Sequence, residues 1–150
     1  MPGRPVSLLL IGSLRSQRPS LRLPLAASTV AAGFPSPADD YIDVGIDLNE
    51  VLIRHPSSTF FLRVSGDSMV EAHIADGDVV LLEPVVDAQR LKEGTIVSAL
   101  VPGSGTTLKH FHRQGAQVRL EAANPNYAPI LVDAEQVTVQ GKLVAVWRQV

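Results

Sequence analysis

Ser68 is the first candidate for chemistry in this sequence. It lies in the segment SGDSM, residues 65–69, and a second sharp turn, Asp76-Gly77-Asp78, follows it. A serine hydroxyl is a weak nucleophile until a neighbouring base removes its proton. The stretch offers no strong base, since we interpret His73 as a surface loop residue. The base for Ser68 must therefore come from a distant part of the chain.

The lysines narrow the choice of base, because the chain has only three of them. Lys92 lies in the polar segment QRLKEG, and Lys142 follows the turn residue Gly141. Lys109 lies in the apolar segment TTLKHFH and shares a strand face with Phe111. Lysine acts as a base only when neutral, and burial lowers its usual pKa of about 10.4. Lys109 is therefore the lysine whose apolar surroundings could bury the amine and lower its pKa.

Together these residues predict a Ser-Lys dyad, a known variant of activated-serine catalysis. Ser68 would attack a carbonyl carbon while neutral Lys109 takes the hydroxyl proton. Backbone N–H groups of the turn that contains Gly66, Asp67 and Met69 would stabilise the oxyanion. Gly66 would allow the turn a backbone conformation that other residues resist. We interpret Asp76, Gly77 and Asp78 as structural.

Composition limits the other functions that the chain can have. It has 150 residues and no cysteine, which excludes disulfides, thiolate zinc sites and cysteine nucleophiles. Residues 1–32 contain four arginines and no acid, so all 15 acidic residues lie in 33–150. An acidic domain repels the phosphate groups of nucleic acid, which argues against direct nucleic-acid binding by residues 33–150. No apolar run approaches the roughly 20 residues of a membrane span.

The composition of residues 1–32 predicts a flexible arm, and residues 33–150 are expected to form the folded domain. The arm has scattered proline, serine and arginine and no long apolar run. A short helix is predicted after it in DLNEVLIRHP, with Asp47 as the N-cap, Glu50 as its capping-box partner and Pro56 as the stop. The acidic run Asp39, Asp40 and Asp43 is expected to be solvated linker.

Beyond the helix the pattern predicts short strands separated by glycine turns, one of them at Gly141. The class is therefore mainly β, a curled or sandwich-like sheet. Trp147 and the strand LVAVW are expected in the core or in a dimer contact, where this strand would form an edge. The predicted strands are TFFLRV, DVVLLE, TIVSALV, TTLKHF, QVRLEA, QVTVQ and KLVAVW.

The ordered set of segments resembles the LexA/UmuD family of self-cleaving serine peptidases (peptidase S24 type), and within it the UmuD branch most closely. SGDSM, then DGD, then TLKHF follow the family's layout, as do AGFPSPADDY, DLNEVLIRHPSSTFFLRV and NPNYAPI. The resemblance covers residues 32–150. It implies a partly barrel-like β fold of the LexA and signal-peptidase type, Ser68 as nucleophile, Lys109 as general base and Ala32–Gly33 as the scissile bond.

The resemblance also implies partners and a cellular role. Cleavage would be stimulated by a RecA filament on single-stranded DNA during the SOS response. The product, residues 33–150, would form a homodimer and act as an accessory subunit of a UmuC-like Y-family DNA polymerase in translesion synthesis. It implies a cytoplasmic protein without a cofactor.

Other interpretations must be weighed against this one. The chain could be an inactive binding module of the same fold, or an exported or organelle-targeted protein with a signal-type N-terminus. A type I signal peptidase shares the Ser-Lys chemistry but needs a membrane anchor. A LexA-type repressor needs a DNA-binding domain, which 32 loose residues would not supply. His110 and His112 could hold a metal, but no third ligand is evident.

Overall fold

The computed structural model describes residues 20–26, 30, 32–33 and 42–150. The chain divides into two units, one up to Ile53 and one from Arg54 to Val150, and each is considered by itself. None of the described helices is long and apolar enough to cross a membrane.

The first unit contains a two-stranded antiparallel ribbon and a short helix. Strand β1 (Leu23–Ala26) pairs with β2 (Ile42–Ile46), and α1 (Leu48–Leu52) follows. Residues 23–26, which lie within the arm that composition predicts, form a strand. Their strand is explained by pairing with a segment that lies about 20 residues later, which the composition of the arm does not reveal.

Helix α1 begins as predicted but is held differently. The Asp47 carboxylate accepts a hydrogen bond from the Asn49 N–H at 2.9 Å, which is the expected N-cap. Glu50 does not serve as a capping-box partner, because its carboxylate pairs with Arg22 at 2.8 Å. The helix ends at Leu52, before Pro56 is reached.

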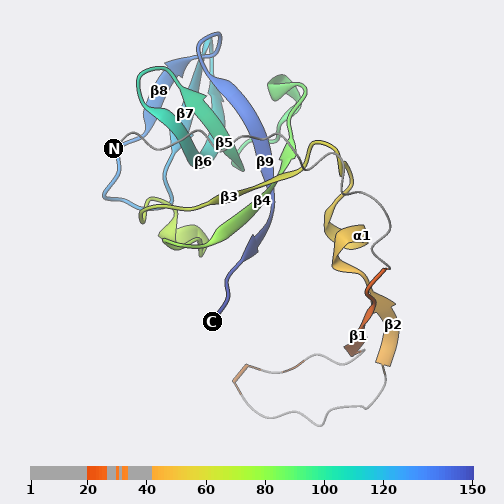
Figure 1. The fold of residues 1–150 in the computed structure, drawn as a ribbon. Helices are drawn as coiled ribbons and strands as arrows, with labels where there is room; N and C mark the ends of the chain where they lie inside the picture. The colour runs from red at the N-terminus through yellow and green to blue at the C-terminus, as the bar shows by residue number, and fades with distance from the viewer. Residues whose placement is uncertain (1–19, 27–29, 31, 34–41) are drawn as a thin grey trace, which may run out of the picture. The chain divides into compact units, whose positions relative to one another are not determined.

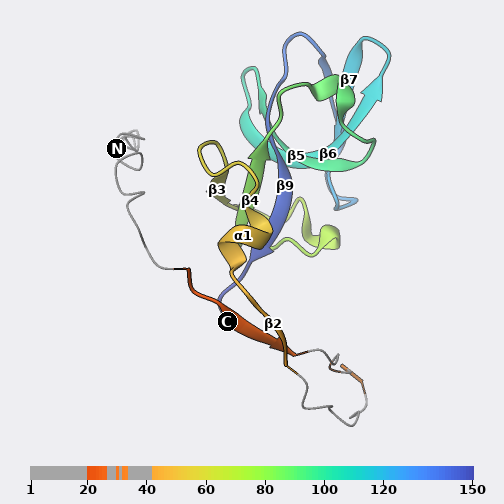
Figure 2. The ribbon, with the colours of Figure 1, turned by 90° about the vertical axis from the view of Figure 1, so that its right-hand side faces the viewer.

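The second unit is a seven-stranded antiparallel sheet, which confirms the mainly β class. Its order is β3-β4-β9-β5-β6-β7-β8, and the sheet curls instead of lying flat (Figures 1 and 2). Two 3₁₀ turns, η1 (Val70–Ala72) and η2 (Ala88–Arg90), lie between strands. The strands are β3 (Phe60–Arg63), β4 (Val79–Pro84), β5 (Thr95–Val101), β6 (Gly105–Gln114), β7 (Gln117–Glu121), β8 (Ile130–Asp133) and β9 (Thr138–Trp147).

Strand β9 corrects three expectations at once. QVTVQ and KLVAVW are one strand, so Gly141 is not in a turn. A side chain at Gly141 would come within 3.0 Å of the Glu83 carbonyl oxygen, so the residue permits close packing of β9 on β4. The strand is also not a simple edge, since it lies between β4 and β5. Strand β8 was not predicted, because proline and polar residues precede it.

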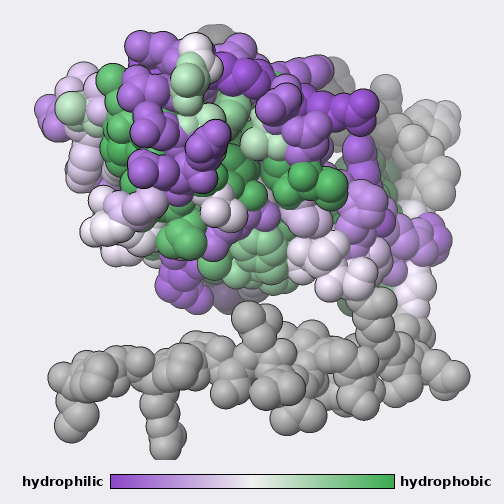
Figure 3. Space-filling model, turned by 90° about the horizontal axis from the view of Figure 1, so that it is seen from above, coloured by the Kyte–Doolittle hydropathy of each residue, from purple (hydrophilic) through white to green (hydrophobic). Residues whose placement is uncertain are grey.

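The core of the second unit consists of two apolar clusters. Phe111 and Leu120 belong to one, together with Val97, Ala99, Val101, Val118 and Val132. Met69, Ile74, Val80 and Leu82 form the other. On the face that Figure 3 shows, hydrophilic residues are mixed with apolar ones. Because Met69 belongs to a cluster, the segment around Ser68 is fixed to the core.

Candidate active site

The turn around Ser68 lies between β3 and η1 and is anchored on both sides. Gly66 has a φ of 90°, in the region that favours glycine, and its N–H donates to the Asp76 carboxylate at 2.7 Å. On the other side Met69 is only 2% exposed. The chain therefore cannot relax freely around Ser68, and its hydroxyl is held at one place.

Lys109 enters the site from the middle of β6. Its side chain is buried, with 7% exposure, whereas Lys92 is exposed and Lys142 pairs with Glu83. The Lys109 Nζ lies 2.9 Å from the Ser68 Oγ. Of the three lysines, the one that the apolar strand pattern singled out is thus the one that contacts the serine.

All partners of the Lys109 amine are uncharged. Besides Ser68, Nζ contacts the Thr107 Oγ1 at 2.7 Å and the Leu108 carbonyl oxygen at 3.1 Å. A neutral amine can donate to these two oxygens and still accept the Ser68 proton with its lone pair. Burial lowers the pKa of the Lys109 amine from its ordinary value. Both features favour the neutral form that a general base requires.

A cleft of about 190 Å³ opens beside the dyad. Leu62, Val64 and Leu108 supply apolar wall, and the Ser68 and Lys109 side chains line it as well. An extended peptide could place a carbonyl group near Ser68 in such a cleft, with water largely displaced. The arrangement is suited to acyl transfer.

A loop from Ala123 to Tyr127, which follows β7 in the chain, holds the turn around Ser68 by hydrogen bonds to Asp67. The Asn124 side-chain amide donates to the Asp67 carbonyl oxygen at 3.0 Å, and the Tyr127 hydroxyl donates to the Asp67 carboxylate at 2.5 Å. The segment NPNYAPI follows the family's layout, but its sequence pattern predicts no role for these residues. No spacing pattern could have linked it to Asp67, which lies 57 residues before Asn124.

The Asp76-Gly77-Asp78 turn is structural, as predicted. Asp76 holds Gly66, and Asp78 is 2% exposed with Arg148 paired to it at 2.6 Å. Hydrogen bonds from the Arg148 guanidinium and the Ala75 N–H lower the pKa of Asp78 to about 2. The carboxylate is therefore ionised at any ordinary pH and fastens the start of β4 to the chain after β9.

The predicted scissile bond lies in the first unit. Ala32 and Gly33 are both exposed and form a bend in the chain. The paired strands β1 and β2 flank the segment that contains them. Asp39 and Asp40 lie outside the described residues, as does the side chain of Asp43.

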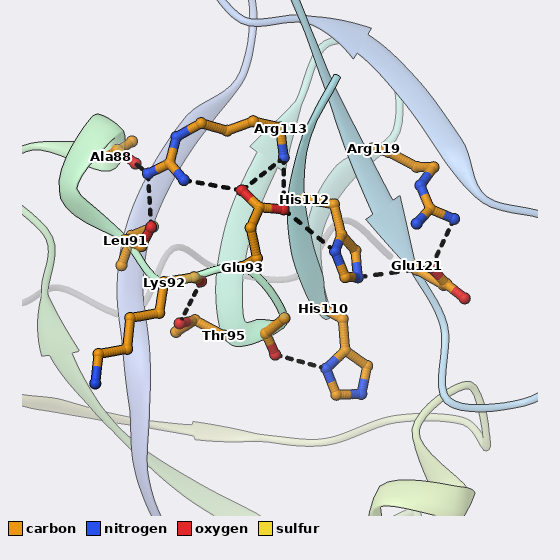
Figure 4. Close-up of polar contacts among 11 residues, drawn as sticks. Ala88, Leu91, Lys92, Glu93, Thr95, His110, His112, Arg113, Arg119 and Glu121 are labelled. Atoms are coloured by element: carbon orange, nitrogen blue, oxygen red, sulfur yellow. Dashed lines mark hydrogen bonds and ion pairs between the residues drawn. The ribbon is translucent and has the colours of Figure 1, made fainter. Parts of the chain in front are cut away.

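The two histidines considered for metal binding have other partners. The His110 Nδ1 lies 2.8 Å from the Gly94 carbonyl oxygen (Figure 4). His112 lies between Glu93 and Glu121, at 3.4 Å and 3.6 Å (Figure 4). Within the part of the chain that the structure describes, no group of three or more His, Cys, Asp or Glu residues is arranged to hold a metal.

Two further residues can be placed. His73 is exposed at the end of η1, as expected of a surface residue. Trp147 is 59% exposed, so of the two expected places the core is excluded for it.

Comparison with known proteins places this geometry in a family context. A family model described as Peptidase S24-like matches residues 24–144. The LexA repressor of Geobacter sp. (strain M21) is 38% identical over 141 residues, which is 91% of this chain and 66% of that protein. The LexA repressor of Zymomonas mobilis is 47% identical over 90 residues, 60% of this chain and 40% of that protein.

LexA repressor 2 of Geobacter sulfurreducens is 35% identical over 150 residues, which is 99% of this chain and 70% of that protein. The chain thus spans about two thirds or less of the length of several relatives that it matches.

Proposed function

The chain belongs to the S24 peptidase family, and from this membership and the 2.9 Å contact between Ser68 and Lys109 we propose that it is a self-cleaving serine peptidase. Its substrate is its own Ala32–Gly33 bond. The contact between hydroxyl and buried amine carries the proposal, because a fold of this class without a dyad would be only a binding module.

The reaction begins with neutral Lys109. As the Ser68 Oγ attacks the Ala32 carbonyl carbon, the Lys109 amine takes the hydroxyl proton and backbone N–H groups of the serine turn stabilise the oxyanion. The C–N bond breaks when Lys109 returns the proton to the Gly33 nitrogen. Water, deprotonated by the same amine, then hydrolyses the ester between Ala32 and Ser68. Serine and lysine end in their original states.

The pKa of Lys109 also offers a way to control the cleavage reaction. A Lys109 that water can reach is charged at neutral pH and inactive as a base. An occupied cleft excludes water and lowers the lysine pKa further. A partner that favours the occupied state therefore accelerates cleavage. We propose that this partner is a RecA filament on single-stranded DNA, an inference that rests on the family resemblance.

Incubation of the purified full chain at alkaline pH tests the proposed reaction. Mass spectrometry should find two fragments, and sequencing should find a new N-terminus at Gly33. Ser68→Ala and Lys109→Ala should each stay full-length. A wild-type chain that stays intact at alkaline pH and with RecA filaments would identify an inactive binding module.

For the product we propose a homodimer. Strand β9 pairs with β5 only as far as Lys142, while its end pairs with β4 alone. Val146 and Trp147 on that end are 40% and 59% exposed. A second copy of this strand would supply the missing hydrogen bonds and cover both side chains. Sedimentation of residues 33–150 should give a dimer that Trp147→Glu weakens.

The downstream role that the UmuD-like segments favour is accessory subunit of a UmuC-like Y-family polymerase in the SOS response, in the cytoplasm. The relatives named LexA repressor favour a second candidate, regulation of transcription. Lesion bypass by such a polymerase, measured with and without the product, tests the first. Operator binding by the intact chain, lost on cleavage, would support the second.

A further inference from the structure

The peptide between Asp67 and Ser68 is held by its carbonyl group. The Asp67 oxygen accepts hydrogen bonds from the Asn124 side-chain amide at 3.0 Å and from the Val70 N–H at 3.3 Å. No cis peptide bond occurs in the described residues, so the Ser68 N–H points away from this oxygen. Whatever fixes the carbonyl therefore also fixes the direction of the Ser68 N–H.

Asn124 is itself firmly placed. Asn124 is only 7% exposed, and its Oδ1 accepts a hydrogen bond from the Asn126 N–H at 2.9 Å. Because Oδ1 is engaged in this way, the NH₂ group is the part that faces Asp67. The Glu71 N–H also donates to the Ala123 carbonyl at 2.8 Å, which fastens the loop to η1.

Tyr127 holds Asp67 at a second point. Its hydroxyl donates to the Asp67 carboxylate, and this bond together with the charge of Asp67 raises the pKa of Tyr127. Tyr127 is 44% exposed, so it contributes less than Asn124. Both side chains come from one short loop and act on one residue, the neighbour of the nucleophile.

We propose that Asn124 is a positioning residue that aims the Ser68 N–H at the oxyanion formed on the substrate carbonyl. This inference rests on the proposed peptidase function and deepens it. A hydrogen bond to a peptide carbonyl polarises the same peptide's N–H, which then donates more strongly. The gain appears in the transition state, where the carbonyl oxygen carries charge, and not in the protonation of Lys109.

The test compares Asn124→Ala with the matched control Asn126→Ala in the full chain. Asn126 lies in the same loop and has an exposed side chain. Self-cleavage is followed over a range of pH. Asn124→Ala should lower the plateau rate about tenfold, less than the 10²–10³-fold loss for a direct oxyanion donor. The pH midpoint, set by Lys109, should stay unchanged, and Asn126→Ala should match wild type.

Nuclear magnetic resonance supplies a readout that general destabilisation would not give. The Ser68 amide nitrogen should shift upfield in Asn124→Ala, because its peptide carbonyl has lost a donor, while amides in β7 and β8 keep their positions. If Asn124→Ala does not fold, Asn124→Asp keeps the size and the oxygen but cannot donate when ionised. Tyr127→Phe, a change at a partly exposed residue, should lower the plateau by about twofold.

The possible outcomes separate this inference from the proposed function. Unchanged plateau rates in Asn124→Ala, Asn124→Asp and Tyr127→Phe would overturn the positioning role while leaving the peptidase intact. A rate loss with a shifted pH midpoint would overturn it too, since Asn124 would then act through Lys109. A wild-type chain that never cleaves would instead remove the proposed function.

Discussion

Strand β6 contains two polar sites with opposite electrostatic character. In its middle, Lys109 contacts Ser68, Thr107 and a backbone carbonyl, all of them uncharged. Near its end, Arg113 pairs with Glu93 at 2.8 Å, and His112 lies between Glu93 and Glu121 (Figure 4). The first site is buried and has one basic group without an acidic partner; the second is partly exposed and has both acidic and basic groups.

The pKa directions follow from this difference. Burial without a counter-charge lowers the pKa of Lys109 and favours loss of its proton. At the other site the Arg113 backbone N–H, assisted by the guanidinium, lowers the pKa of Glu93 and keeps it charged. A cluster of ionisable groups is therefore not by itself a sign of catalysis. The informative feature is a buried ionisable group whose neighbours carry no opposite charge.

Arg113 shows what the second site does instead. Its guanidinium donates to the carbonyl oxygens of Ala88, Gln89 and Leu91, and it stacks on Phe111 at 5.4 Å. It thereby fastens the η2 loop to β6. We interpret this polar cluster as structural.

Among substitutions at these two sites on β6, Lys109→Arg should have the largest effect, a loss of cleavage. A guanidinium keeps the positive charge but does not release its proton at accessible pH. We expect a loss of cleavage rate of about 10⁴-fold or more, as for other catalytic dyads and triads. Quantified fragments at alkaline pH provide the measurement. Substantial cleavage by this variant would mean that the lysine acts through its charge and not as a base.

Thr107→Asp would make the first site resemble the second. A carboxylate next to the Lys109 amine should raise its pKa, which moves the pH midpoint of cleavage upward. At neutral pH the rate should fall by about 10-fold to 10³-fold. Thr107→Val is the control, because it removes the hydroxyl without adding charge. An unchanged midpoint in Thr107→Asp would contradict the role given to neutral surroundings.

Wild-type stability should depend on pH through the same lysine. The folded pKa of Lys109 lies below the unfolded value, so the unfolded chain binds more protons between the two. The free energy of unfolding should therefore rise with pH across that window, and this rise should be absent in Lys109→Met. Urea unfolding at several alkaline pH values measures it. Equal slopes for both proteins would mean that Lys109 titrates normally.

Arg113→Ala should affect stability and not chemistry. The loss of its contacts with the η2 loop should lower the melting temperature by about 5 °C, whereas the pH midpoint of cleavage should not move. Arg113→Lys should recover only part of the loss, because an ammonium group cannot reproduce the guanidinium fork. A shifted midpoint would show that the two sites on β6 are coupled.

His112→Gln should have the smallest effect. Its contacts with Glu93 and Glu121 are long and partly exposed, so the expected change in melting temperature is below about 2 °C. Salt should reduce the difference further. A large loss of stability would mean that this histidine does more than occupy a charged surface.

Much of the fold and part of the site could be predicted from local patterns. Short runs rich in β-branched or aromatic residues predicted β3 to β7 close to their observed bounds, and an apolar strand singled out Lys109. Gly141 was misread as a turn because glycine permits both turns and close packing, and only the neighbouring β4 distinguishes them. Strand β8 is short and was missed, and the role of Asn124 depends on a contact with Asp67 that lies 57 positions away in the sequence.

The sequence by itself determined the class of the sheet, the turn at Ser68 and the choice of lysine, because each depends on residues within a few positions of one another. Only the tertiary structure decided that Nζ and Oγ meet at 2.9 Å, that Asn124 holds the Asp67 peptide and that Lys109 has uncharged neighbours. The contact of Lys109 with Ser68 and that of Asn124 with Asp67 join residues that are 41 and 57 positions apart. They depend on strand order and register, which side chains along the whole sheet settle together.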